Sequence, residues 1–258
     1  MQTKNNMEVE KWACYYGEDS SSLARLEEYD LVVMEPDHGF TPPENTRTLY
    51  VGYVSLGEAE KFRWYWKEIE GRDFILWENE NWKDDYLIDI RSSEWQDFLV
   101  KRIIPKIIAK GYEGLFFDTI DTPLFLEEKD SEKFAGSAVA LGTLIKRIRE
   151  TFPDLVLVSN NGLRAVTHIG AYVDVFVLES MFTTYDFESK NYGKADSSWR
   201  KKRIGQINAN KELFAGKPVL VIDYADPGDK ALKDWSGAEC KKRGFVPYHT
   251  TIDLQKLF

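Results

Sequence analysis

Acidic residues end several short apolar runs, and two of them have the pattern of a catalytic pair. Asp118 ends Gly-Leu-Phe-Phe-Asp, and Glu179 ends Val-Phe-Val-Leu-Glu. An ionised carboxylate at the end of a buried strand is costly unless it is paired or put to use. Glycosidic bonds are hydrolysed by two carboxyl groups, one protonated and one ionised. The pattern therefore predicts glycoside hydrolysis by Asp118 and Glu179, with Asp121 as the alternative to Asp118.

The two carboxyl groups are expected to take different protonation states. Glu179 follows a wholly apolar strand, and desolvation raises a carboxyl pKa, so we expect Glu179 to be the protonated acid. Asp118 would then be the ionised partner. A carboxylate at Asp121 would raise the pKa of Asp118 and reverse these roles.

Other side chains near the same strand ends are expected to bind substrate. Flat aromatic faces suit the apolar face of a pyranose, and phenols can donate hydrogen bonds to hydroxyl groups. Of the crowded tryptophans at positions 64, 66, 77 and 82, two are expected to line a cleft. The alternative is that each acid caps a helix or pairs with Lys or Arg. The expected substrate-binding residues are Glu35, Glu58, Tyr53, Asn160, Asp223, Tyr224, Tyr248, Trp64 and Trp77.

Eight apolar runs predict the scaffold that positions these residues. Near-continuous apolar strands separated by helical patterns are typical of parallel βαβ units. Eight such units form a (β/α)8 TIM barrel, whose active site lies at the carboxyl ends of the strands. We therefore expect Glu35, Glu58, Asp118, Glu179 and Asp223 at one mouth. The expected strands are Trp12–Tyr16, Leu31–Glu35, Leu49–Leu56, Gly114–Asp118, Leu155–Asn160, Val175–Glu179, Val219–Asp223 and Phe245–Thr250.

Helical patterns and one interruption fill the intervals. A capping box at Ser93 and Gln96 predicts a helix that Pro105 kinks or shortens. Further helices are expected along the stripe from Phe134 to Ile148, from near Asp196 to Gly216, and from about Asp229 to Gly244. The segment Phe74–Ile90 departs from this rhythm. It predicts an inserted hairpin or excursion after the third strand.

Composition narrows the classes of function. The length of 258 residues and the absence of any visible linker favour a single α/β domain over residues 1–258. A net charge of −9 argues against general nucleic-acid binding. No apolar run is long enough for a membrane helix. The three scattered histidines indicate no metal centre and no catalytic triad, and no nucleotide-binding motif is present, so no cofactor is expected. The sequence leaves open a bridge between Cys14 and Cys240.

The motifs in this order resemble glycoside hydrolase family 114, the endo-α-1,4-polygalactosaminidase-like barrels. The resemblance spans most of the chain and includes Gly57-Glu-Ala-Glu60, Phe117-Asp-x-x-Asp121 and Glu179-Ser-Met-Phe-Thr183. It implies that the acids after the fourth and sixth strands are catalytic: Asp118 or Asp121, and Glu179. It also implies an α-1,4-linked polysaccharide containing galactosamine as substrate, without a cofactor.

Two alternatives remain open from sequence. The same acids could hydrolyse a different glycan, or the chain could be a non-catalytic carbohydrate-binding barrel. The resemblance favours an extracellular location, whereas Met1–Glu10 has no signal-peptide core. The sequence does not indicate an oligomeric state.

Overall fold

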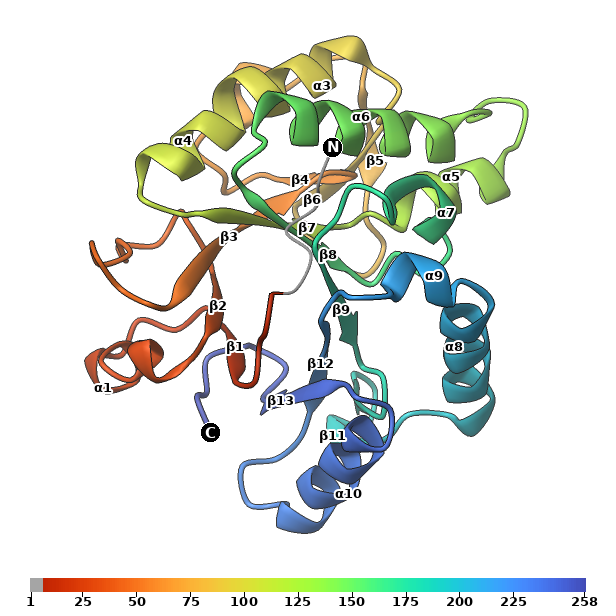
Figure 1. Cartoon of the computed structure of the whole chain (residues 1–258). Helices are drawn as coiled ribbons and strands as arrows, with labels where there is room; N and C mark the ends of the chain where they lie inside the picture. The colour runs from red at the N-terminus through yellow and green to blue at the C-terminus, as the bar shows by residue number, and fades with distance from the viewer. Residues whose placement is uncertain (1–6) are drawn as a thin grey trace.

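Eight parallel strands form a barrel in the computed structural model, which describes residues 7–258 (Figure 1). The strands follow chain order around the sheet, and their register pairs Asp118 on the fourth strand with Ser55 on the third. This confirms the predicted (β/α)8 TIM barrel, with strand bounds within one residue of those expected. The strands are β1 (Trp12–Tyr15), β2 (Leu31–Met34), β3 (Leu49–Ser55), β7 (Gly114–Asp118), β8 (Val156–Asn160), β9 (Val175–Glu179), β12 (Val219–Tyr224) and β13 (Val246–Thr250).

The first and last strands lie side by side but are joined differently from the others. Within residues 7–258, no ladder pairs β1 with β13. Instead, the Trp12 indole donates a hydrogen bond to the Val246 carbonyl at 3.0 Å, and its ring packs against Tyr248. Beyond the strand ends, the Tyr16 amide donates to the carbonyl of Leu254 at 2.8 Å. The barrel is therefore nearly closed, with side-chain and loop contacts along this seam.

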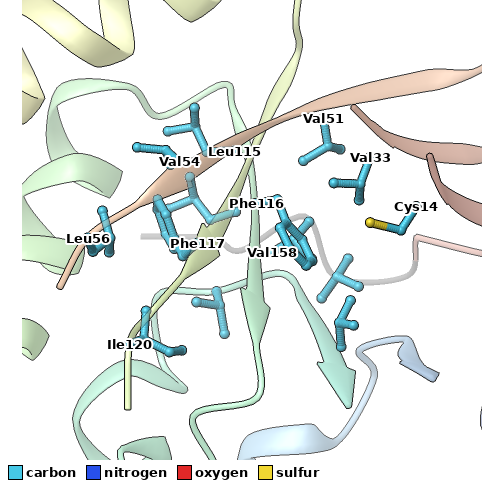
Figure 2. Close-up of a cluster of buried hydrophobic side chains, with 14 of the residues drawn as sticks. Cys14, Val33, Val51, Val54, Leu56, Leu115, Phe116, Phe117, Ile120 and Val158 are labelled. Atoms are coloured by element: carbon cyan, nitrogen blue, oxygen red, sulfur yellow. The ribbon is translucent and has the colours of Figure 1, made fainter. Parts of the chain in front are cut away.

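Alternation along the strands separates two apolar layers. Successive side chains of a strand point to opposite faces. Cys14, Val33, Val51, Phe116 and Val158 fill the barrel interior, whereas Leu115 and Phe117 face the surrounding helices (Figure 2). The interior set stands directly beneath the polar residues at the strand ends, since Phe116 is two residues before Asp118 and Val158 is two before Asn160. Apolar packing thus forms the floor on which the site rests.

The helices cover the outside of the barrel, and α1, α3, α8 and α10 begin at polar side-chain caps. Asp196 accepts hydrogen bonds from the amides of Ser198 and Trp199, and Asp229 accepts one from Leu232. The expected capping box at Ser93 was wrong by one residue, because Ser92 is the cap and accepts from the amide of Trp95. The helices are α1 (Ser20–Leu23), α2 (Trp66–Ile69), α3 (Ser93–Phe98), α4 (Ile104–Ala109), α5 (Thr122–Lys129), α6 (Ser137–Thr151), α7 (Val166–Ile169), α8 (Ser197–Ala209), α9 (Lys211–Phe214) and α10 (Lys230–Lys241), with a 3₁₀ turn at Leu26–Glu28.

Pro105 changes the helix that contains it. A π-helical segment, Leu99–Ile103, joins α3 to α4, so that Pro105 falls in the first turn of α4. Proline lacks the amide hydrogen that a helix interior needs, and the first turn does not need it. The predicted interruption is therefore present. Phe134 was expected within the next helix but precedes it, because α6 begins at Ser137.

Two antiparallel excursions stand on the mouth side of the barrel. The strands β5 (Ile75–Glu78) and β6 (Asp85–Ile88) form the expected hairpin, and β4 (Glu58–Glu60) adds a third strand to it. A second hairpin, β10 (Thr183–Asp186) with β11 (Asn191–Lys194), follows β9 and was not expected. It begins within the Glu-Ser-Met-Phe-Thr motif and has no long apolar run to indicate it.

Two further sequence questions are answered by the structure. Cys14 and Cys240 are both buried and free, so they form no bridge. Within residues 7–258, no helix combines the length and the apolar character needed to cross a bilayer.

Candidate active site

A cavity of about 500 Å³ opens at the carboxyl ends of the barrel strands. It receives side chains from β1, β3, β7, β8, β9 and β12, and from Glu35 directly after β2. The excursion of β4, β5 and β6 and the segment after β13 also contribute side chains. This is the mouth at which barrels of this type carry their active sites. Of the residues expected from sequence, it is lined by Glu35, Tyr53, Glu58, Asp118, Asn160, Glu179 and Tyr224.

Asn160 joins Asp118 and Glu179 into one unit. Its amide nitrogen donates to Asp118 Oδ1 at 2.9 Å and to Glu179 Oε2 at 2.8 Å. The distance between Asp118 Oδ1 and Glu179 Oε2 is therefore no greater than the sum of these two hydrogen-bond lengths. The Asn160 side-chain oxygen is buried and has no hydrogen-bond partner within residues 7–258. Asn160 thus uses its donor for the two acids and leaves an acceptor free.

Two neutral donors hold the Glu179 carboxyl group. The Tyr224 hydroxyl donates to Glu179 Oε1 at 2.6 Å, in addition to the bond from Asn160. Burial and the neighbouring Glu179 carboxylate raise the pKa of Asp118 to about 6. Desolvation was the reason to expect the proton on Glu179, but in the structure desolvation raises the pKa of Asp118. Burial also keeps the pKa of Tyr224 and Tyr53 well above the usual value, so both phenols stay donors.

Left-handed backbone follows each member of this unit. Thr119, Asn161 and Ser180 have φ values of 55°, 55° and 53°, and they come directly after Asp118, Asn160 and Glu179. Residues other than glycine adopt this conformation at a cost, and such strain is stored where surrounding contacts hold it. The three strands therefore turn sharply at the positions that present the polar side chains to the cavity.

Arg203, on a helix outside the barrel, links two of these turns by hydrogen bonds. It lies on α8, is 4% exposed, and donates to the Glu179 carbonyl at 2.7 Å and to Asn161 Oδ1 at 2.5 Å. The same Asn161 oxygen accepts the Glu179 amide at 3.0 Å. One guanidinium, with donors in a rigid fork, thus links the ends of β8 and β9.

Arg63 organises the acidic wall on the opposite side of the cavity. Its guanidinium pairs with Glu35 at 2.7 Å, Glu60 at 2.9 Å and Asp37 at 3.3 Å. It also lies over the Tyr53 ring, with 5.0 Å to the centroid. Lys110 also pairs with Asp37, at 4.0 Å, so this wall has three carboxyl groups for two cations.

A second pair of carboxyl groups, Glu58 and Asp85, lines the cavity, and Glu58 also lines a neighbouring hollow. Glu58 accepts hydrogen bonds from Thr122 at 2.5 Å and from Asn79 at 3.0 Å. Burial and the adjacent Glu58 raise the pKa of Asp85 to about 9. Asp85 therefore favours its protonated form more than an exposed carboxyl group does, and Glu58 is held by neutral donors.

Five expected site residues lie outside this cavity. Asp121 accepts from the Gly162 amide at 3.1 Å and lines the neighbouring hollow of about 270 Å³, together with Trp77. Asp223 is fully buried and accepts from the amides of Phe182 and Thr183 and from Ser236, so its expected place at the mouth was wrong. Its carboxylate instead fixes the turn after β9. Tyr248 packs on Trp12 along the barrel seam, and Trp64 lies among aromatic residues away from the cavity.

Several lining residues were missed in the sequence. Trp82 lines the cavity, whereas Trp64 and Trp77 were chosen from the same crowded set. Glu60 and Arg63 lie within or just after the Gly-Glu-Ala-Glu motif, which was the signal that could have indicated them. Ile252 and Leu254 arrive from beyond the last strand, and no sequence pattern indicates this. The other missed residues are Cys14, Tyr16, Phe62, Asn79, Lys83, Asp85, Phe116, Thr119 and Ile222.

The arrangement can deliver and accept a proton on either side of a bound molecule. Two carboxyl groups face one cavity, a phenol and an amide hold them, and the pKa of Asp118 is raised to about 6. Such a pair can work as acid and nucleophile or as acid and base. Within residues 7–258, no three His, Cys, Asp or Glu side chains are grouped to hold a metal ion.

Comparisons with known proteins agree with this geometry. The model of glycoside-hydrolase family GH114 matches residues 2–258. An uncharacterized protein of Thermotoga maritima is 23% identical over 256 residues, which cover 93% of this chain and 74% of the relative. The structure is similar to the glycoside hydrolase domain of PelA from Pseudomonas aeruginosa, with a TM-score of 0.84, 23% identity, and 97% and 98% of the two chains covered. It is also similar to Aspergillus fumigatus Ega3 in complex with galactosamine, with a TM-score of 0.70, 14% identity, and 98% and 96% covered. At these identities, the two structures share the fold with this chain.

Proposed function

This chain belongs to glycoside-hydrolase family GH114, and on that premise we propose that it cleaves within an α-1,4-linked polysaccharide containing galactosamine. One observation carries the proposal: Asn160 holds the Asp118 and Glu179 carboxyl groups together at the bottom of a cavity. A barrel that only binds sugar has no need to couple two acids in this way. Asp121, which lies in the neighbouring hollow, is not part of the proposed pair.

The pair would act by donating one proton and using one carboxylate. The protonated acid transfers its proton to the glycosidic oxygen as the bond to the anomeric carbon breaks. The carboxylate attacks that carbon, and water then displaces it after giving a proton back to the first residue. Carboxyl groups about 5 to 5.5 Å apart are typical of this retaining route, and about 6.5 to 9.5 Å of inversion. The shared Asn160 donor limits the separation and favours retention.

The charge of the cavity supports an amino sugar as substrate. Six carboxyl side chains line it, from Glu35, Glu58, Glu60, Asp85, Asp118 and Glu179, against two cations, from Arg63 and Lys83. Even with Asp85 neutral, the acids outnumber the cations. An ammonium group on galactosamine would gain from this field. The similar fold of Ega3 holds galactosamine itself.

Release of reducing ends tests the proposal directly. Purified protein should release them from an α-1,4-linked galactosamine polymer, and more slowly from the fully N-acetylated polymer. A protein carrying both Asp118→Asn and Glu179→Gln is the control and should release none. Proton NMR of the first product should show the anomeric configuration of the substrate. Release of reducing ends only from another polysaccharide would show that the proposed substrate is wrong. Binding of the polymer without release of reducing ends would show that the protein is a binding protein and not a hydrolase.

A further inference from the structure

Exposed aromatic side chains are concentrated at the mouth of the catalytic cavity. Phe62 is 72% exposed and Trp82 is 55% exposed, and both line the cavity. Phe187 is 60% exposed, and its ring meets the Trp82 ring edge-on with centroids 5.7 Å apart. Rings this exposed contribute little to folding, because they remove little apolar surface from water. Exposed apolar groups gathered at a cavity indicate a ligand.

The contact between Trp82 and Phe187 joins two separate excursions. Trp82 lies in the turn between β5 and β6, which follow β3, and Phe187 lies in the turn between β10 and β11, which follow β9. In the barrel sheet, β7 and β8 lie between β3 and β9. The ring contact therefore links the two sides of the mouth that flank the strands carrying Asp118 and Asn160.

Further rings hold the Phe187 turn in place. Tyr185 lies edge-on to Phe187 at 5.1 Å and packs on Tyr192 at 5.0 Å. The Tyr192 hydroxyl accepts the amide hydrogen of Ile252 at 3.2 Å, and Ile252 itself lines the cavity. The exposed ring is thus supported by a row of aromatic residues that ends at the cavity wall.

We propose that Trp82 and Phe187 form an aromatic subsite that holds one sugar unit of the polysaccharide beside the unit being cleaved. The proposal rests on the function proposed above and names residues for a second part of the substrate. The apolar face of a pyranose would pack on the indole, and the edge-on ring contact would be exchanged for contacts of both rings with the sugar. Lys83, next to Trp82, also lines the cavity. Its positive charge would repel the ammonium group of the sugar, which would therefore turn toward the acidic wall. The aromatic subsite would then recognise the sugar ring, and the carboxyl groups of the cavity would recognise the positive charge of its ammonium group.

Kinetics with Trp82→Ala and Phe187→Ala test the subsite. We expect Trp82→Ala to raise KM for the galactosamine polymer about tenfold and to leave kcat within about twofold, because the reacting groups are untouched. The double variant should raise KM by less than the product of the two single effects, because the two rings bind the same sugar unit. The control is Trp199→Ala, which removes an indole that is 48% exposed on α8, outside the cavity. It should leave KM unchanged.

Binding to an inactive protein separates the subsite from cleavage. In the Glu179→Gln background, calorimetry with α-1,4-linked galactosamine oligosaccharides should show binding that Trp82→Ala weakens about tenfold. The N-acetylated oligosaccharides should show the same ratio, because the rings contact the sugar face. That result supports the subsite even if the unaltered protein cleaves neither polymer, which would overturn only the proposed activity. Equal binding with and without Trp82, or a loss confined to kcat, would overturn the subsite.

Discussion

At the level of single residues, the site is defined by how three side chains from adjacent strands share hydrogen bonds. Asn160 was expected to bind substrate, and in the structure it also binds both acids. Burial and the Glu179 carboxylate together raise the pKa of Asp118, so the charge of Glu179 affects the protonation of Asp118. Changes at one residue are therefore expected to affect the other.

Neutral amides at either acid should stop turnover without unfolding the protein. We expect Asp118→Asn and Glu179→Gln each to lower kcat at least about a hundredfold, because a proton donor or a nucleophile is lost. The matched control is Asp121→Asn, the same change three residues away and outside the cavity. It should keep kcat close to that of the unaltered protein. Near-normal turnover in Asp118→Asn with none in Asp121→Asn would transfer the role to Asp121.

The raised pKa of Asp118 also predicts a pH dependence of stability. Its folded pKa of about 6 lies above the unfolded value of about 3.9, so the folded state binds more protons between these values. The contribution of Asp118 to the free energy of unfolding therefore falls as the pH rises from about 4 to about 6. Asp118→Asn has no carboxyl group at this position and so does not lose stability in this way. The free energy of unfolding of Asp118→Asn minus that of the unaltered protein should therefore be higher at pH 7 than at pH 4, by on the order of 1 to 2 kcal/mol.

Denaturant unfolding of both proteins at the two pH values measures this difference. Asp121→Asn serves again as the control for a general charge effect. A stability difference between Asp118→Asn and the unaltered protein that is the same at pH 4 and pH 7 would contradict a raised pKa.

At the level of elements, the sequence was most informative where a strand ends. Apolar runs that stop at an acid or amide predicted β7, β8 and β9 and the residues they present, because buried parallel strands have a simple pattern. Asp223 has the same pattern but a different role, since its side chain accepts the backbone amides of the turn after β9. Alternation alone could not distinguish these cases. The direction of each side chain depends on loops whose course no local pattern specifies.

Arg203 should matter for turnover although it lies behind the site. It links the backbone of Glu179 to Asn161, and a misplaced catalytic group costs much of the rate. We expect Arg203→Met to lower kcat about tenfold to a hundredfold with little change in KM. Arg203→Lys should recover only part of this, because a single ammonium does not reproduce the rigid fork. Steady-state kinetics measure both constants.

The control for this variant lies on the same helix. Arg200 donates to the Ala195 carbonyl at 3.0 Å and is not part of the cavity lining. Arg200→Met should leave kcat unchanged. Equal losses in Arg200→Met and Arg203→Met, or a loss that appears only in KM, would show that the link does not position Glu179.

At the level of the whole molecule, the barrel was predictable and the finer shape of its mouth was not. Eight apolar runs with helices between them are compatible with few other folds. The second hairpin, β10 with β11, is short and mostly polar, and the segment after β13 spans only residues 251–258. Their positions result from long-range contacts such as the ring pair of Trp82 and Phe187. Because local sequence does not specify these contacts, Trp64 and Trp77 were predicted to bind substrate, whereas Trp82 lines the cavity.

The overall charge predicts a salt dependence. With a net charge of −9 and an acidic cavity, the protein should attract a cationic polymer from a distance. We expect kcat/KM for the galactosamine polymer to fall several-fold between about 10 mM and 150 mM salt, as the screening length shortens from about 30 to 8 Å. The fully N-acetylated polymer is the neutral control and should show little change. Equal salt effects on both polymers would contradict electrostatic attraction.

The seam between β1 and β13 has a consequence for how the protein comes into being. A ribosome releases Asp118, Asn160 and Glu179 well before it makes Val246, whose carbonyl receives the Trp12 indole, and Leu254, which lines the cavity. During that interval the seam lacks the Trp12–Val246 hydrogen bond, and the cavity lacks the Leu254 side chain. The cavity is therefore complete only after the segment that follows β13 has been made and has reached the start of the barrel.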